Sequence, residues 1–105
     1  MNFGKLGSVV TVANTLATPY TVPAISIATV NLNVVNAGST DAKVKIAISL
    51  TPSPAQADYI EYNVVISPGC VLERTGITCG ANENITILSD VTGVVMRVHG
   101  IEETA

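Results

Sequence analysis

The side chains that could carry catalysis in this 105-residue chain are few: one histidine, two cysteines and eight carboxylates. A hydrolase triad needs a nucleophile, an imidazole and an orienting carboxylate brought together in a cleft. His99 shares with Arg97 the face of the last β-prone run that alternation makes polar, and no residue spacing nominates partners for it. The sequence therefore predicts a surface histidine and no catalytic residue.

The carboxylates are dispersed in a way that disfavours acid–base or metal chemistry. Asp58 and Glu61 are the nearest pair within one β-prone run, and their odd spacing places them on opposite faces. A general acid and base would have to converge, and a calcium loop would need a denser acidic turn. Glu102 and Glu103 are interpreted as a solubilising tail. We expect no metal, no cofactor and no enzymatic activity.

The two cysteines, Cys70 and Cys79, are too few for a disulfide framework and lack the paired spacing of a zinc site. We predict two free thiols, with a Cys70–Cys79 bridge as the alternative. Synthesis in a reducing cytoplasm favours the thiols. No cationic region followed by an apolar run marks a signal peptide at the N-terminus, so we expect synthesis in the cytoplasm without one.

Composition narrows the classes of partner. Charged residues make up 12% of the chain, against about 25% in typical soluble domains. Such a surface fits a protein packed against neighbours in an assembly, and it also fits a secreted binding module. A net charge of −3 without a basic cluster argues against nucleic acid, and Lys43 and Lys45 are interpreted as a solvated strand face. No apolar run is long enough to predict a membrane span.

The elements that must position these side chains are β-strands, because apolar residues alternate in short runs between turn signals. Residues 28–35 and 44–50, joined by the turn cluster 36–41, are predicted to form a hairpin. The proline-containing segment 51–57 is predicted to cross between sheets. Ser67-Pro68-Gly69 then separates two strands as a hairpin or a sheet-to-sheet corner.

About seven such runs without a helical period predict an all-β fold, a single immunoglobulin-like β-sandwich, with a jelly roll as the alternative. Residues 1–22 are expected to form an N-terminal arm or edge strand, because Pro19 interrupts the pattern, and residues 23–105 the sandwich, in one domain overall. The predicted core comprises Val30, Leu32, Val34, Val44, Ile46, Ile48, Ile60, Tyr62, Val64, Ile85, Ile87, Met96 and Val98.

Several segments together resemble a small β-sandwich domain of tailed-bacteriophage virion proteins, and they run in order through nearly the whole chain. The most specific are Ala57-Asp-Tyr-Ile-Glu-Tyr62 and Val71-Leu-Glu-Arg-Thr-Gly76. The others are Tyr20-Thr-Val-Pro23, Thr29-Val-Asn-Leu-Asn-Val-Val-Asn36, Val44-Lys-Ile-Ala-Ile48 and Val95-Met-Arg-Val-His-Gly-Ile-Glu-Glu103. Cys70 departs from the pattern, where another small residue is usual.

The resemblance implies a non-enzymatic virion component, made in the host cytoplasm and located on the capsid surface. A decoration or cement protein that binds the major capsid protein is the first expectation. A tail-fibre or adaptor module and a module that binds host-surface carbohydrate are the alternatives. A homotrimer is expected because virion β-domains commonly assemble so.

The N-terminal segment is the candidate capsid contact, since its apolar side chains fit a central strand poorly and need cover. These side chains are Phe3, Leu6, Val9, Val10, Val12 and Leu16. The acidic C-terminal end is expected to contribute little to attachment, because exposed carboxylates form weak, salt-screened contacts.

Overall fold

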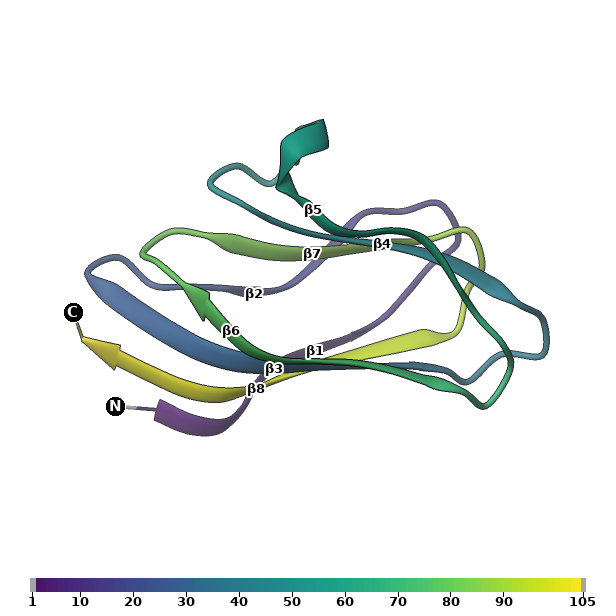
Figure 1. Ribbon diagram of the computed structural model, residues 1–105, viewed down its shortest axis with the longest axis horizontal. Coiled ribbons are helices and arrows are strands. Elements are labelled where there is room, and N and C mark those ends of the chain that lie inside the picture. The colour runs from purple at the N-terminus through teal and green to yellow at the C-terminus, as the bar shows by residue number, and fades with distance from the viewer. Residues whose placement is uncertain (1, 105) are drawn as a thin grey trace.

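A computed structural model describes residues 2–104, which fold into eight β-strands and one short 3₁₀ helix (Figure 1). The strands are β1 (Asn2–Val10), β2 (Ala17–Thr21), β3 (Ser26–Asn36), β4 (Ala42–Ser49), β5 (Tyr59–Ile66), β6 (Val71–Cys79), β7 (Asn84–Ser89) and β8 (Val94–Thr104), and the helix is η1 (Gln56–Asp58). No helix among the described residues is long and apolar enough to span a membrane.

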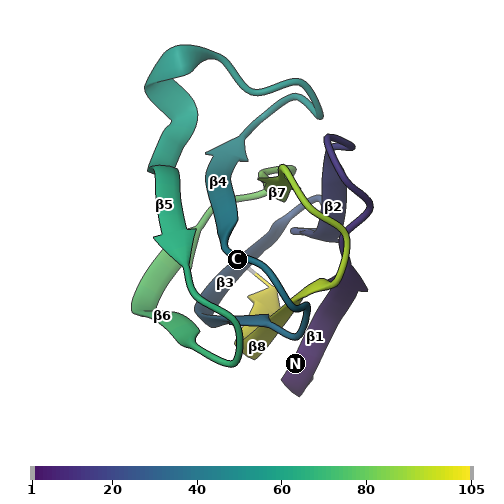
Figure 2. The same ribbon diagram turned by 90° about the vertical axis from the view of Figure 1, so that its right-hand side faces the viewer.

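The strands form two four-stranded antiparallel sheets that pack face to face (Figure 2). The strand order is β1-β8-β3-β6 in one sheet, called here the first sheet, and β2-β7-β4-β5 in the other, the second sheet. Every connection except β4–β5 passes from one sheet to the other. The all-β sandwich predicted from the sequence is confirmed, with eight strands rather than seven.

The core lies between the sheets and follows the alternation of the sequence. Apolar side chains on the inner faces of β3, β4, β7 and β8 are almost fully buried, because successive side chains of a strand point to opposite faces. This confirms Val30, Leu32, Val34, Val44, Ile46, Ile85, Ile87, Met96 and Val98 as core residues. Ile48 is only partly buried and packs against the same cluster.

Strand β5 corrects the predicted core. Ile60 and Tyr62 are exposed, whereas Glu61 between them is buried. The register with β4 shifts on both sides of Ile46, and Asn63 has a φ of 54°. Each irregularity adds a residue to β5 and so exchanges its inner and outer faces. Simple alternation through this strand was therefore the wrong model.

The predicted hairpin of residues 28–50 is also wrong, because β3 and β4 lie in different sheets. The buried side chain of Asn36 holds the corner between them. Its Nδ2 donates to the carbonyl oxygens of Thr40 at 2.7 Å and Ile66 at 2.8 Å, and its Oδ1 accepts from the Gly38 amide at 2.9 Å. The carboxamide thereby joins the corner after β3 to the end of β5.

The segment predicted to cross between sheets, residues 51–57, instead joins β4 to β5 within the second sheet. Ser67-Pro68-Gly69 connects β5 to β6 and crosses between the sheets, so of the hairpin and the sheet-to-sheet corner predicted there, the corner is confirmed. Gly69 has a φ of 77°, and its amide donates to the Asn36 carbonyl at 2.8 Å. A left-handed backbone at this point favours glycine.

Strands β1 and β2 occupy the same edge of the sandwich, one in each sheet. Strand β1 pairs with β8 along its length, with a bulge between Lys5 and Gly7. Gly7 brings the two edge strands together, because a Cβ there would lie 2.1 Å from the Pro19 carbonyl oxygen. Only glycine allows this approach.

Candidate binding surfaces

The six predicted contact residues divide between the core and the surface. Leu6 and Val9 are partly buried and pack against the hydrophobic core. Phe3, at 77% exposure, lies near the start of β1, and Val10, at 60%, lies at its end. The remaining two, Val12 and Leu16, are exposed in the connection to β2. The structure therefore does not gather all six in one place.

Valine side chains form a continuous row across the outer face of the first sheet, near the end of β1. Val10 pairs with Val95, Val95 with Val35, and Val35 with Val71, so each of the four strands contributes one residue. Val10 and Val71 are exposed at the two edges, and the two central valines are half-buried. We call these four residues the valine row. Val12 follows it along the chain.

The middle of the same outer face is polar. His99 pairs with Lys5 on one side and Asn31 on the other, and Arg97 pairs with Asn33. His99 is half-buried, and its Nδ1 is a buried nitrogen without a hydrogen-bond partner within residues 2–104. His99 was predicted to be a surface histidine; it lies on the outer face of β8, where its side chain is half-buried.

Glu102 does not belong to a solvated tail, which corrects the interpretation made from the sequence. It lies in β8, where its Oε1 accepts from the Tyr20 hydroxyl at 2.6 Å and its Oε2 accepts from Asn2 Nδ2 at 2.8 Å. These two hydrogen bonds lower the pKa of the Glu102 carboxyl. Burial, and then the hydrogen bond to Glu102, raises the pKa of the Tyr20 hydroxyl. The carboxylate links β8 to both edge strands.

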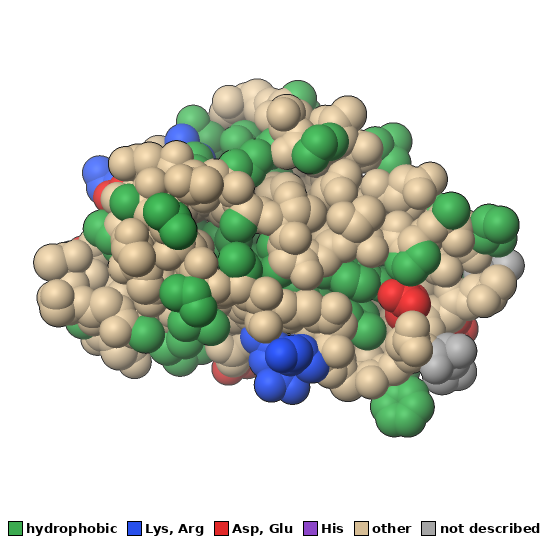
Figure 3. All heavy atoms as spheres, turned by 180° about the vertical axis from the view of Figure 1, so that it is seen from behind, with side chains coloured by type: hydrophobic (Ala, Val, Ile, Leu, Met, Phe, Trp, Pro, Cys, Tyr) green, Lys and Arg blue, Asp and Glu red, His purple; other side chains and the backbone are tan. Residues whose placement is uncertain are grey.

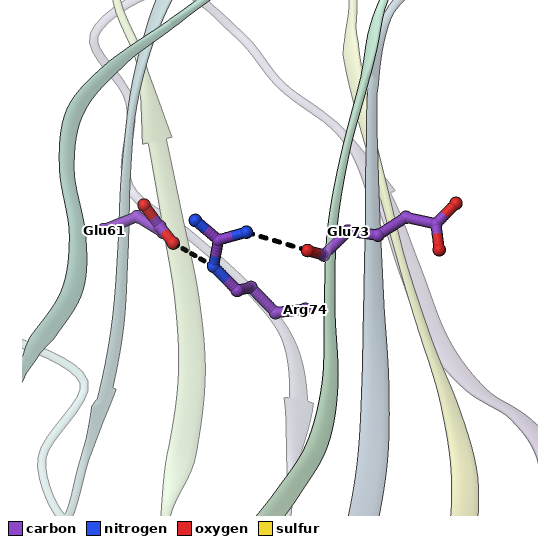
Figure 4. Close-up of polar contacts among 3 residues, drawn as sticks. All are labelled: Glu61, Glu73 and Arg74. Carbon is purple, nitrogen blue, oxygen red and sulfur yellow. Dashed lines mark hydrogen bonds and ion pairs between the residues drawn. The ribbon is translucent and has the colours of Figure 1, made fainter.

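The opposite edge of the sandwich carries an ion pair between the sheets. Glu61 of β5 and Arg74 of β6 pair through Oε1 and Nε, and Arg74 Nη1 also donates to the Glu73 carbonyl oxygen at 2.9 Å (Figure 4). The Glu61 side chain is 9% exposed and that of Arg74 46%. Within residues 2–104 this is the only ion pair. Inward-pointing charges on edge strands oppose pairing with another chain.

Cys70 lies directly before β6 and is exposed, whereas Cys79 is the last residue of β6 and is buried. A nine-residue strand spans about 30 Å, far beyond the Cα separation that a disulfide tolerates. The prediction of free thiols is confirmed. Burial, with the charge of Glu83 adding to it, raises the pKa of the Cys79 thiol to about 11.

A small pocket of about 100 Å³ lies on the second sheet, over β4, β5 and β7. Its lining residues are polar except for one leucine: Asn14, Lys43, Lys45, Asn63, Leu88 and Asp90. The pocket was not predicted from the sequence. The shared face of Lys43 and Lys45 was visible in the sequence, but the residues around them come from a loop, a bulge and a strand end.

Charged residues make up only 12% of the chain. Figure 3 shows one face on which apolar side chains are scattered among backbone atoms and side chains that are neither apolar nor charged. Among residues 2–104, no three His, Cys, Asp or Glu side chains gather in a way that could hold a metal. No protein-family model matches the chain, and neither a curated protein nor a solved structure shows significant similarity to it.

Proposed function

We propose that this protein is a non-enzymatic structural component of a bacteriophage virion, a decoration or cement protein that binds the major capsid protein. The observation that carries the proposal is the valine row, with Val12 beside it along the chain. Exposed apolar side chains that are contiguous mark protein interaction sites, whereas scattered ones do not. The low charge of the surface suits an environment in which the protein is covered by neighbours.

The virion assignment also agrees with the order of the strands. An immunoglobulin constant-type sandwich has its first two strands adjacent in one sheet, whereas here β1 and β2 belong to different sheets. Eight strands in two sheets, with nearly every connection crossing between them, suit the double Greek key of a jelly roll, an architecture used in viral capsids. We therefore favour the jelly roll over the immunoglobulin-like topology.

The proposed contact surface is the valine row together with Val12, rather than the whole N-terminal segment. Val10 and Val71 are the most exposed members of the row, and burying each would contribute about 1.5–3 kcal/mol before ordering costs are subtracted. We propose a homotrimer as the assembled form, and each trimer would present three such surfaces to the capsid. Multivalency would raise the overall affinity without any further contact.

Point substitutions test this surface better than deletions, because removing β1 would uncover the core side of Leu6 and Val9. The double variant Val10→Thr/Val71→Thr keeps β-branched shape while adding hydroxyl groups. Its matched control is Val65→Thr, since Val65 is similarly exposed, at 55%, on the other sheet. We expect the double variant to bind weakly to particles stripped of this protein, and the control to bind normally. Equal binding by both would contradict the proposed surface.

Copy number tests the class of virion protein. A decoration protein is present in hundreds of copies per particle, whereas fibre and adaptor components number in the tens or fewer. Quantitative gel analysis of purified virions distinguishes the two. A count in the tens would overturn the decoration proposal and favour the fibre or adaptor alternative.

A further inference from the structure

The pocket on the second sheet gathers cationic, carboxamide and carboxylate groups that the contact surface proposed above does not use. Lys43 and Lys45 project from the same face of β4, because they are two residues apart. Lys45 pairs across the sheet with Leu88, which gives the pocket an apolar patch. Asp90 is fixed at the rim, since its Oδ1 accepts from the Lys43 amide at 2.8 Å.

The two lysine ammonium groups are available to a ligand. Neither forms an ion pair with a carboxylate within residues 2–104. Lys45 Nζ instead lies 4.8 Å from the centre of the Tyr62 ring, a cation–π contact that holds it over the outer face of the second sheet. Two of the chain's five cationic side chains therefore meet in one pocket of a protein whose net charge is −3.

Two asparagines with left-handed backbones complete the lining. Asn14 has a φ of 56° and Asn63 a φ of 54°. Asn14 is anchored by its amide, which donates to the Ser89 carbonyl at 2.8 Å, and Asn63 lies beside the irregular register of β5. A carboxamide both donates and accepts hydrogen bonds, so it can match a hydroxyl group in either role.

We propose that this pocket binds a carboxylate-bearing sugar residue. The lysines would pair with the carboxylate, the asparagine carboxamides and Asp90 would hydrogen-bond the ring hydroxyls, and Leu88 would contact the apolar C–H groups of the ring. A phosphate ion fits less well, because its higher negative charge would face the Asp90 carboxylate and it has no apolar face for Leu88. A volume of about 100 Å³ is smaller than a whole monosaccharide, so the carboxylate and the adjoining part of one sugar ring would enter the pocket while the rest of the ring stayed outside.

The binding test is a titration of the isotopically labelled full chain, followed by amide chemical shifts in NMR. The probes are glucuronic acid and N-acetylneuraminic acid, with glucose and inorganic phosphate for comparison. We expect saturable shifts at the pocket residues with at least one of the two sugar acids and weaker effects with both comparison compounds. Phosphate binding as tight as the sugar acid would overturn the saccharide assignment. If neither sugar acid produced saturable shifts at the pocket residues, the proposed binding site would be wrong.

Substitutions then connect the binding to the named side chains. Lys43→Ala and Lys45→Ala should each weaken sugar-acid binding about tenfold, the loss expected for one charge-assisted hydrogen bond. Lys5→Ala is the matched control, because Lys5 is an exposed lysine on the other sheet. An equal loss in the Lys5 variant would indicate a general charge effect and contradict the assignment.

Asparagine-to-glycine changes separate the carboxamide from the backbone. Asn63→Gly removes the side chain and leaves a residue that tolerates the positive φ. Asn82→Gly is its control, since Asn82 also has a positive φ, 66°, but lies in the turn between β6 and β7 outside the pocket. We expect weaker binding only in the Asn63 variant. Unchanged sugar-acid binding by the Asn63 variant would show that its carboxamide does not contribute to the site. Normal capsid attachment by all the pocket variants would show that this site is separate from the valine row.

Discussion

Glu61 and Arg74 form an ion pair that joins the edge strand of one sheet to the edge strand of the other, across the open side of the sandwich (Figure 4). The buried carboxylate depends on its partner, because the Glu61 side chain is only 9% exposed. Burying a charge without a partner is costly.

Removing one member of this pair should destabilise the fold more than removing both. We expect Arg74→Leu to lower the free energy of unfolding by about 1–3 kcal/mol, since Glu61 is left unpaired. The double variant Glu61→Leu/Arg74→Leu should recover much of that loss. Urea denaturation measures both, with Arg97→Leu, exposed and unpaired within residues 2–104, as the control. If the double variant lost as much free energy of unfolding as the two single variants combined, the two side chains would not be energetically coupled.

Asn36 is expected to be the most sensitive polar residue of the core. Asn36→Ala would leave the carbonyl oxygens of Thr40 and Ile66 and the amide of Gly38 without this partner. We expect a loss of about 2–4 kcal/mol, because two or more buried groups lose their hydrogen bonds. Asn33→Ala, on the outer face of the same strand, is the control. Equal midpoints in thermal denaturation would contradict the role given to Asn36.

Gly7 should not tolerate a side chain. In Gly7→Ala the new Cβ would overlap the Pro19 carbonyl, so β1 and β2 would have to separate. We expect a lower thermal midpoint and faster hydrogen exchange in β1 and β2. Gly4→Ala tests the alternative of backbone strain alone, because Gly4 has a φ of 98° but no atom near a Cβ. A larger effect at Gly4 would show that strain outweighs the close approach.

The two thiols should differ in reactivity. At pH 8, iodoacetamide should modify Cys70 quickly, whereas Cys79 should react only after unfolding, because burial raises its pKa to about 11 and excludes the reagent. Mass spectrometry of peptides from folded and urea-unfolded protein checks this. Rapid labelling of Cys79 in the folded protein would mean that the end of β6 opens readily.

The Glu102 carboxylate should make stability depend on pH. Its pKa is lower in the folded protein than in the unfolded chain, so its contribution is fully present above the unfolded value of about 4.3 and is lost as the pH falls through the folded value. Tyr20→Phe removes one of its hydrogen bonds and should flatten that acid dependence. Denaturant melts of both proteins between pH 6 and 2 measure the difference, and identical curves would contradict it.

Alternation in the sequence was sufficient to predict the sandwich and most of its core, because the core positions predicted in β3, β7 and β8, and those in β4 as far as Ile46, are buried. It failed in β5, where the extra residues exchange the faces and put Glu61 inside. Nothing in the types of Ile60 or Tyr62 signals this change. The positive φ of Asn63 is common for asparagine, but asparagine occurs in many other settings.

Strand neighbours were harder to predict than the strands themselves. The turn after Asn36 has the composition of a hairpin turn, yet it joins two sheets because the Asn36 carboxamide binds backbone on both sides of the corner. The pocket could not be predicted either, because its lining depends on which strands are neighbours. Lys43 and Lys45 are visible as a pair, but Asn14, Leu88 and Asp90 reach them only through the order of the strands.

The pairing of β1 with β8 places Asn2 opposite Glu102, so the first and last strands of the chain are neighbours in one sheet. A nascent chain on the ribosome cannot complete the first sheet until its last strand has emerged. Contacts between residues so far apart in sequence carry a high loop-closure entropy, which makes folding slow. Until β8 arrives, the inner faces of β1 and β3 remain uncovered, so newly made chains are exposed to aggregation until β8 has been synthesised.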